Sequence, residues 1–268
     1  MTPPQPAPVE PVTAEPPPLD RRPVLRQRWC ELAYFHWRYD AADVQALLPP
    51  GVTVDTFDGS AWVGLIPFVM RDVAIGPTPP VPWLGTFIEI NVRTYVVDPT
   101  GRRAVWFFSL DVPRLAIVGV ARSVFALPYC WSAADHVVDH RPDGSRHRYR
   151  MRRRWPGARP GARPSADMRF TVGDAIPAAE VSELDHFLSA RWALLTSRRE
   201  RLLYGRVHHE RWPLHRVTDH AITQNVVEAA GLPTPAGPVH ALYAPEVGVS
   251  IPWIETVDAA ASARKDQS

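Results

Sequence analysis

The clearest pattern of apolar and polar positions along the chain lies in residues 87–95. Alternate side chains there are apolar on one face and mixed on the other, as in FIEINVRTY. This period of two predicts a β-strand. Turn residues follow at 98–101, and the apolar run 104–111 predicts a second strand that is covered on both faces. We therefore expect a hairpin near the middle of a sheet.

The mixed face of the first predicted strand carries an acid and a base four residues apart. Glu89 and Arg93 flank Asn91, and an aromatic ring stands at each end of the row. Inside a barrel such a row lines a cavity. The alternative is a solvated outer face with a local Glu89–Arg93 ion pair, because structural ion pairs also occupy such faces.

Other segments follow the same two periodicities. Alternation or turn residues predict strands at 27–37, 52–57, 61–70, 133–140, 147–152, 170–172, 239–243 and 248–253. Helical spacing, capping residues and breakers predict helices at 41–48, 113–125, 183–195 and 219–230. Segments 201–208 and 210–216 add further elements, and the basic stretch 153–166 is expected to be a solvated loop.

No repeat or linker divides residues 26–257, so we predict a single α+β domain there, mainly antiparallel, with helices packed outside. Residues 1–25 are rich in proline, and we expect them to be disordered, as we do residues 258–268.

Composition narrows the class of protein. The chain is 46% hydrophobic and contains ten tryptophans, enough for a substantial core, whereas a formal charge of +2 argues against a nucleic-acid partner. No window holds the roughly 18 uninterrupted apolar residues of a spanning helix. We expect no signal peptide and no membrane partner, and a soluble, cytoplasmic protein in which Cys30 and Cys130 are free thiols.

One motif follows the predicted helix 113–125. Ala121-Arg122, a short interval and then Leu127-Pro128-Tyr129-Cys130 resemble the acetoacetate decarboxylase signature, where Gly-Arg-Glu leads into Pro-Lys-Lys. A larger set of motifs, spread over residues 25–255, resembles the YqjF-like family in the acetoacetate decarboxylase-like superfamily. These motifs are His36-Trp37, Leu48-Pro49, Asp55-Thr56-Phe57-Asp58-Gly59, Glu89 to Tyr95, Phe108-Ser109-Leu110-Asp111 and Phe187 to Trp192. The resemblance implies an acetoacetate decarboxylase-like β-barrel.

The decarboxylase uses a lysine that attacks the substrate ketone. In this chain Tyr129 and Cys130 follow Pro128, and the one lysine of the sequence is Lys265. Schiff-base catalysis by that route is therefore excluded. By order along the chain, the resemblance makes Glu89 the acid of the pocket strand and Arg122 the arginine of Gly-Arg-Glu.

The candidate catalytic residues are accordingly Glu89, Tyr129 and Arg122. Tyr129 can donate a hydrogen bond or act as an acid on a carbonyl or enolate, or it can simply fill the pocket as an aromatic wall. Arg93, with Asn91 and His36, is a candidate for ligand binding, because arginine suits a planar carboxylate. His36 has a purely structural alternative.

Two further motifs give weaker indications of function. His208-His209-Glu210 suggests a metal ligand set, but adjacent strand residues point to opposite faces, so we expect no metal site. Cys130 lacks an evident partner that would activate it as a nucleophile.

Two functions remain open. One is an enzyme that handles a small keto acid or carbonyl compound by acid/base chemistry without lysine. The other is a non-catalytic protein that binds or senses a small ligand on the same scaffold. In either case we expect an anionic small-molecule ligand, no cofactor, and a chain that can form homo-oligomers.

Overall fold

The alternating and apolar segments form one continuous, mainly antiparallel sheet. The structure, a computed structural model, describes residues 8–142, 144–156 and 163–257. Its strands, in chain order, are β1 (Pro23–Tyr39), β2 (Thr53–Val54), β3 (Ala61–Ile75), β4 (Phe87–Val97), β5 (Arg103–Val112), β6 (Tyr129–Arg141), β7 (Gly144–Trp155), β8 (Ser165–Ala175), β9 (Ala193–Arg198), β10 (Arg201–Arg206), β11 (His208–His209), β12 (His215–Gln224), β13 (His240–Pro252) and β14 (Glu255–Thr256).

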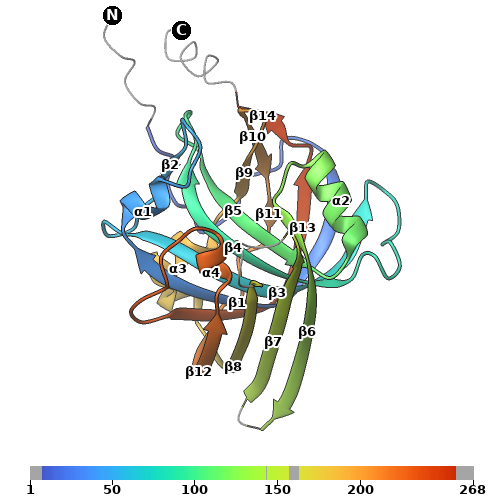
Figure 1. Cartoon of the computed structure of the whole chain (residues 1–268), viewed down its shortest axis with the longest axis vertical. Coiled ribbons are helices and arrows are strands. Elements are labelled where there is room, and N and C mark those ends of the chain that lie inside the picture. The colour runs from blue at the N-terminus through green and yellow to red at the C-terminus, as the bar shows by residue number, and fades with distance from the viewer. Residues whose placement is uncertain (1–7, 143, 157–162, 258–268) are drawn as a thin grey trace, which may run out of the picture.

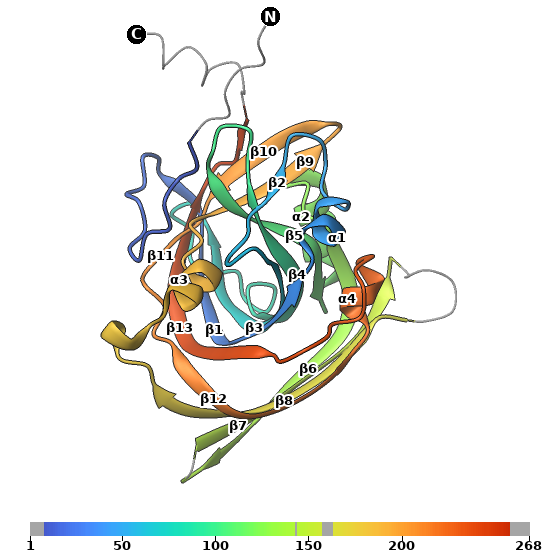
Figure 2. The same ribbon diagram turned by 90° about the vertical axis from the view of Figure 1, so that its left-hand side faces the viewer.

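Strand order in the sheet is β14-β10-β9-β5-β6-β7-β8-β12-β13-β1-β3-β4-β2, with β11 beside β13 and an additional pairing of β4 with β5. Strand β5 runs parallel to β6 and to β9. Figure 1 shows β6 and β7 extending side by side at one end of the molecule, and Figure 2 shows the long strands curving around a common centre.

Short helices interrupt the strands. They are α1 (Ala41–Gln45), α2 (Leu115–Val124), α3 (Glu183–Ser189), α4 (Val226–Ala229) and a 3₁₀ turn at Ala178–Glu180. Asp40 caps α1 through its side chain, and Ser182 caps α3 in a capping box with Asp185. Helix α2 buries Val118 and Ala121 against the sheet (Figure 1).

The predicted central hairpin is confirmed as β4 and β5. Its register places Ile90 opposite Asp111 and Tyr95 opposite Val105. Ile90 and Val92 belong to one hydrophobic cluster, whereas Phe87 and Leu110 belong to a second cluster. Because β4 is covered on both faces, the row that contains Glu89 and Arg93 lies inside the molecule.

Two predicted helices include residues that the structure places in strands. Residues 219–224 belong to β12, which pairs with β8 over most of its length, and the helix is confined to α4. Helix α3 ends at Ser189, and residues 193–195 enter β9 beside β10 and β5. In both cases pairing with distant strands overrides the local helical spacing. Residues 210–214 form no strand, and part of the predicted loop 153–166 lies outside the described residues.

The expectation of a disordered stretch over residues 1–25 requires correction where the structure describes it. The backbone of Glu10 bonds to Gly101, and the Arg103 side chain donates to the Glu10 carbonyl at 2.6 Å. The indole of Trp192 donates to Thr13 at 3.2 Å. Polar contacts with the sheet thus hold a proline-rich segment that has too few apolar side chains to form a core of its own. Strand β1 begins at Pro23.

Among the described residues, no helix combines the length and apolar character needed to cross a membrane.

Candidate functional site

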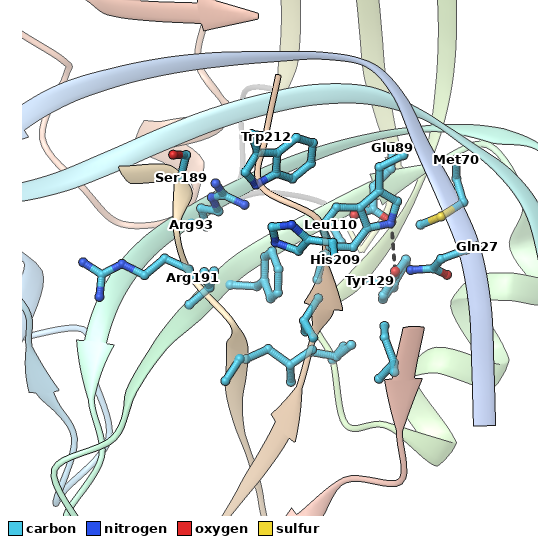
Figure 3. A pocket seen from close by; sticks show the side chains of 18 residues that line it. Gln27, Met70, Glu89, Arg93, Leu110, Tyr129, Ser189, Arg191, His209 and Trp212 are labelled. Carbon is cyan, nitrogen blue, oxygen red and sulfur yellow. Dashed lines mark hydrogen bonds between the residues drawn. The ribbon is translucent and has the colours of Figure 1, made fainter. Parts of the chain in front are cut away.

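A cavity of about 80 Å³ lies inside the sheet, on the side of β4 that carries Glu89 and Arg93. Figure 3 shows it from close by. Its lining is mostly apolar and aromatic, and includes Trp29, Met70, Phe107, Leu110, Leu127 and Trp212. One buried water needs about 10–15 Å³ of such space. The cavity therefore has room for about five to eight water-sized groups, which suits a small organic molecule.

The carboxyl group of Glu89 has a pKa near physiological pH, so both its neutral and its charged form are populated there. It is 3% exposed, and burial raises its pKa from 4.5 to about 7, helped by the negative charge of Asp111. Hydrogen bonds from Tyr129 and Asn91, together with the charge of Arg93, act in the opposite direction. A carboxyl with this pKa can both accept and return a proton at neutral pH.

Tyr129 lies on the cavity wall. Its Oη donates to Glu89 Oε2 at 2.8 Å, the dashed line in Figure 3. Burial and the neighbouring Glu89 raise the pKa of this phenol well above its ordinary value of 10.0. Tyr129 therefore remains a hydrogen-bond donor at any physiological pH.

Arg93 is the cationic member of the cavity. It is 7% exposed, yet it forms no ion pair with a carboxylate in the described part of the chain, and its Nε has no hydrogen-bond partner there. Its guanidinium instead lies over the rings of Tyr34 and Tyr95, 5.4 and 5.8 Å from their centroids. The predicted alternative, a solvated face with a Glu89–Arg93 ion pair, is therefore wrong.

Polar groups lie at both ends of the cavity, and the His209 imidazole lies between them. Figure 3 shows Arg93 and Ser189 on one side, Glu89 and Tyr129 on the other, and the apolar Leu110 between them. An anionic group of a ligand at Arg93 would leave the rest of that ligand pointing at the acid and the phenol.

Three predicted site residues lie outside the cavity lining. Arg122 is exposed on α2, donates to the backbone carbonyl of Tyr129 at 2.8 Å, and lies over Trp155. Arg122 follows the buried Val118 by four residues, but the Tyr129 carbonyl and the Trp155 ring engage its guanidinium outside the cavity. Asn91 and His36 are buried behind the lining, and Asn91 Nδ2 donates to Glu89 Oε1 at 3.4 Å.

Other lining residues were not predicted. Arg191 contributes its stem, while its guanidinium donates to Asp55 at 2.6 Å and to the Phe187 carbonyl. His209 lines the cavity, whereas His208 lies half-buried and contacts the carbonyl of Pro17. The motif Phe187 to Trp192 was the available signal for Arg191, and the adjacent histidines on opposite faces were the signal for His209.

Cys130 is unsuited to nucleophilic chemistry. Burial, followed by the negative charge of Asp111, raises the pKa of its thiol to about 11. Burial likewise raises the pKa of Cys30 to about 12, and both cysteines are free. Among the residues that the structure describes, no group of histidine, cysteine and acidic side chains could hold a metal ion.

The class of fold follows from solved structures. An acetoacetate decarboxylase-like enzyme from Sphingomonas wittichii RW1 aligns with a TM-score of 0.60, over 89% of this chain and 94% of its own, at 15% identity. The enduracididine biosynthesis enzyme MppR, complexed with pyruvate, aligns at 0.61 over 90% and 93%, with 14% identity. Acetoacetate decarboxylase from Legionella pneumophila aligns at 0.57 over 91% of each chain, with 13% identity. The protein has the acetoacetate decarboxylase-like fold.

Sequence comparison then identifies the family. Residues 26–248 match the DUF2071 model, described as an uncharacterized conserved protein (COG2071). The uncharacterized protein YqjF of Bacillus subtilis (strain 168) is 31% identical over 213 residues, which cover 79% of this chain and 84% of YqjF. The chain belongs to the DUF2071 family, and the predicted YqjF-like resemblance is confirmed.

Proposed function

We propose that the protein acts on a small 2-oxo carboxylate by proton transfer at the carbon next to the carbonyl, without a Schiff base. The observation that carries this proposal is one cavity with a buried Arg93, which has no ion pair among the described residues, at one end and the Glu89–Tyr129 pair at the other. Arginine binds carboxylates through planar hydrogen-bonding groups. An acid with a pKa near neutrality suits general acid/base catalysis.

Each group has one role in the step. Arg93 holds the substrate carboxylate. The Glu89 carboxylate removes a proton from the carbon beside the ketone, and the electron pair of that C–H bond forms a carbon–carbon double bond. The carbonyl π electrons move onto oxygen. Once Glu89 has taken up the proton, the single O–H of Tyr129 turns from Glu89 to the enolate oxygen and donates a hydrogen bond there. Return of a proton from Glu89 to carbon regenerates the ketone.

Size and enclosure support this assignment. Space for about five to eight water-sized groups matches a molecule such as pyruvate, which the structurally similar MppR binds. We infer that the enclosure is a β-barrel, since pairing from β5 through β6, β7, β8, β12, β13, β1, β3 and β4 returns to β5. An apolar interior strengthens the electrostatic effect of Arg93 and Tyr129 on a developing enolate.

Exchange of pyruvate methyl protons for deuterium tests the chemistry. In D₂O at pH 7, the parent protein should accelerate the loss of the methyl signal in proton NMR, whereas Glu89→Gln should abolish the acceleration. The matched control is Asp135→Asn, which alters an exposed carboxylate that pairs with Arg150. Exchange in Glu89→Gln at the parent rate would overturn the proposal.

A second candidate, a ligand-binding or sensor protein, is favoured by one specific observation. In the part of the chain that the structure describes, Arg93 has no anionic partner, and a carboxylate ligand would supply one whether or not chemistry follows. Calorimetry with pyruvate in H₂O separates the two candidates. Binding that depends on Arg93, without proton exchange, identifies a binding protein.

A further inference from the structure

A row of three residues crosses the sheet behind the cavity. His36 on β1 pairs in register with Gly64 on β3, and Gly64 pairs with Arg93 on β4. A Cβ atom added to Gly64 would lie 2.7 Å from His36 Nε2, far inside contact distance. The absence of a side chain at Gly64 therefore lets the His36 imidazole occupy the space between the strands that carry His36 and Arg93.

Hydrogen bonds fix the His36 ring in one protonation state. Its Nε2 lies 2.6 Å from Tyr95 Oη, and Tyr95 Oη donates to the backbone carbonyl of Leu188 at 2.6 Å. A carbonyl can only accept, so the single phenolic proton points at Leu188. His36 Nε2 must then carry a hydrogen and donate to Tyr95. Burial and the charge of Arg93 keep the pKa of His36 well below 6.5, so the ring is neutral.

The same histidine touches both rings that support Arg93. The Arg93 guanidinium lies over Tyr34 and Tyr95, and His36 stacks on Tyr34 with centroids 5.9 Å apart and planes at 19°. No carboxylate among the described residues orients this guanidinium. The two tyrosines are therefore its nearest support. Trp212 packs on Tyr34 and Phe187 packs on Tyr95, whereas His36 contacts both rings.

We propose that His36 is a positioning residue, which sets the direction of Arg93 through Tyr95 and Tyr34 and thereby the affinity of the cavity for a carboxylate. This inference rests on the proposed function only in taking Arg93 as the carboxylate site. It is independent of proton transfer by Glu89. It replaces the sequence-based expectation that His36 contacts the ligand itself.

The experiment measures binding of oxamate, a pyruvate analogue without an acidic C–H bond, by isothermal calorimetry. His36→Leu removes the donor to Tyr95, and Gly64→Ala displaces the imidazole without removing a polar group. Each should weaken oxamate binding by about 2- to 13-fold, the range of one neutral hydrogen bond. His36→Gln, whose amide can donate to Tyr95, should restore most of the affinity. Gly119→Ala, at a site with no atom within 4 Å, is the control.

Each outcome decides the proposal. Parent-like oxamate affinity in a folded His36→Leu protein overturns it, as does failure of His36→Gln to recover affinity that His36→Leu loses. If His36→Leu does not fold, Tyr95→Phe replaces it, because it keeps the ring under Arg93 and removes only Oη. Weakened binding there supports the proposal, and unchanged binding overturns it.

The two proposals can fail separately. A parent protein that binds no oxamate overturns both the positioning role and the carboxylate site. A parent that binds oxamate but does not exchange pyruvate protons overturns only the proposed chemistry. If oxamate affinity depends on His36 and Gly64 but pyruvate protons do not exchange, His36 positions Arg93 in a protein that binds its ligand without catalysis.

Discussion

Two arginines of this protein are equally buried and differ in what surrounds them. Arg153 and Arg93 are each 7% exposed. Arg153 donates to both oxygens of Asp111, at 2.7 and 2.6 Å, and Asp111 also accepts from Ser132 at 2.7 Å. Arg93 has aromatic rings in place of an acid.

The difference separates a charge with a structural partner from the charge that we propose to bind a ligand. The Arg153 guanidinium has its charge neutralised by Asp111, and this ion pair links β7 to β5. A buried guanidinium without a counter-ion is costly, which favours an anion that arrives as a ligand. Burial alone would not have distinguished Arg93 from Arg153, because the informative quantity is the missing partner.

The largest expected effect comes from removing the cation of the Arg153–Asp111 ion pair. Arg153→Met leaves Asp111 buried without its cation, so the free energy of unfolding should fall by about 3–5 kcal/mol. Urea unfolding at pH 7 measures this. Arg153→Met/Asp111→Asn removes both charges and should recover part of the loss. Arg150→Met, from the exposed Asp135 pair, should cost no more than about 1 kcal/mol. A single Arg153→Met variant that unfolds like the parent would contradict the assignment.

Glu89 provides the next largest effect. Its folded pKa, about 7, lies above its ordinary value of 4.5, so the folded state binds more protons than the unfolded state between these values. The parent should therefore lose stability relative to Glu89→Gln as pH rises from about 4.5 to 7, by about 3 kcal/mol in total. Unfolding series from pH 4.5 to 8 test this. A difference between parent and variant that does not change with pH would show that Glu89 titrates normally.

Replacing Arg93 tests whether its charge serves ligand binding more than stability. Arg93→Met should weaken oxamate binding by about 10- to 150-fold, which corresponds to 1.5–3 kcal/mol for hydrogen bonds to a charged group. The free energy of unfolding without ligand should fall much less than in Arg153→Met. No ion pair among the described residues is broken, and Glu89, which loses the favourable charge of Arg93, can take up a proton instead. Calorimetry and urea unfolding of the same samples give both quantities. Destabilisation comparable to that of Arg153→Met would mean that Arg93 has a structural counter-ion.

Local patterns identified the centre of the fold. Strands β4 and β5 could be predicted because strict alternation, a turn and an apolar run all lie within one hairpin. Strand β12 could not, since its residues 219–224 precede a short helical segment and its pairing partner β8 lies far away in the sequence. Interactions between distant segments decided that element.

The residues of the candidate site also fall into two groups, those that the local sequence indicates and those that only the folded sheet brings together. Glu89 and Arg93 were predictable because one strand carries both, and the motif around Pro128 pointed to Tyr129. The outward direction of Arg122 depends on how α2 packs, which helical spacing alone does not specify. His209 and Arg191 reach the cavity from the C-terminal half of the chain, so their proximity to Glu89 exists only after the sheet has formed.

The smallest expected effect concerns the hydrogen bond within the functional end. Tyr129 donates to Glu89 and favours its charged form, so Tyr129→Phe should raise the pKa of Glu89 above about 7. A hydrogen bond to a charged carboxylate is stronger than one to a neutral carboxyl by about 1 kcal/mol, which corresponds to somewhat less than one pKa unit. The pH at which pyruvate exchange reaches half its maximum should move to higher values in the variant, because the Glu89 carboxylate that removes the proton forms only at higher pH. Tyr204→Phe is the matched control, since its buried hydroxyl has no partner among the described residues and lies outside the cavity lining. A midpoint that stays in place, or moves to lower pH, would show that Tyr129 does not tune the acid it contacts.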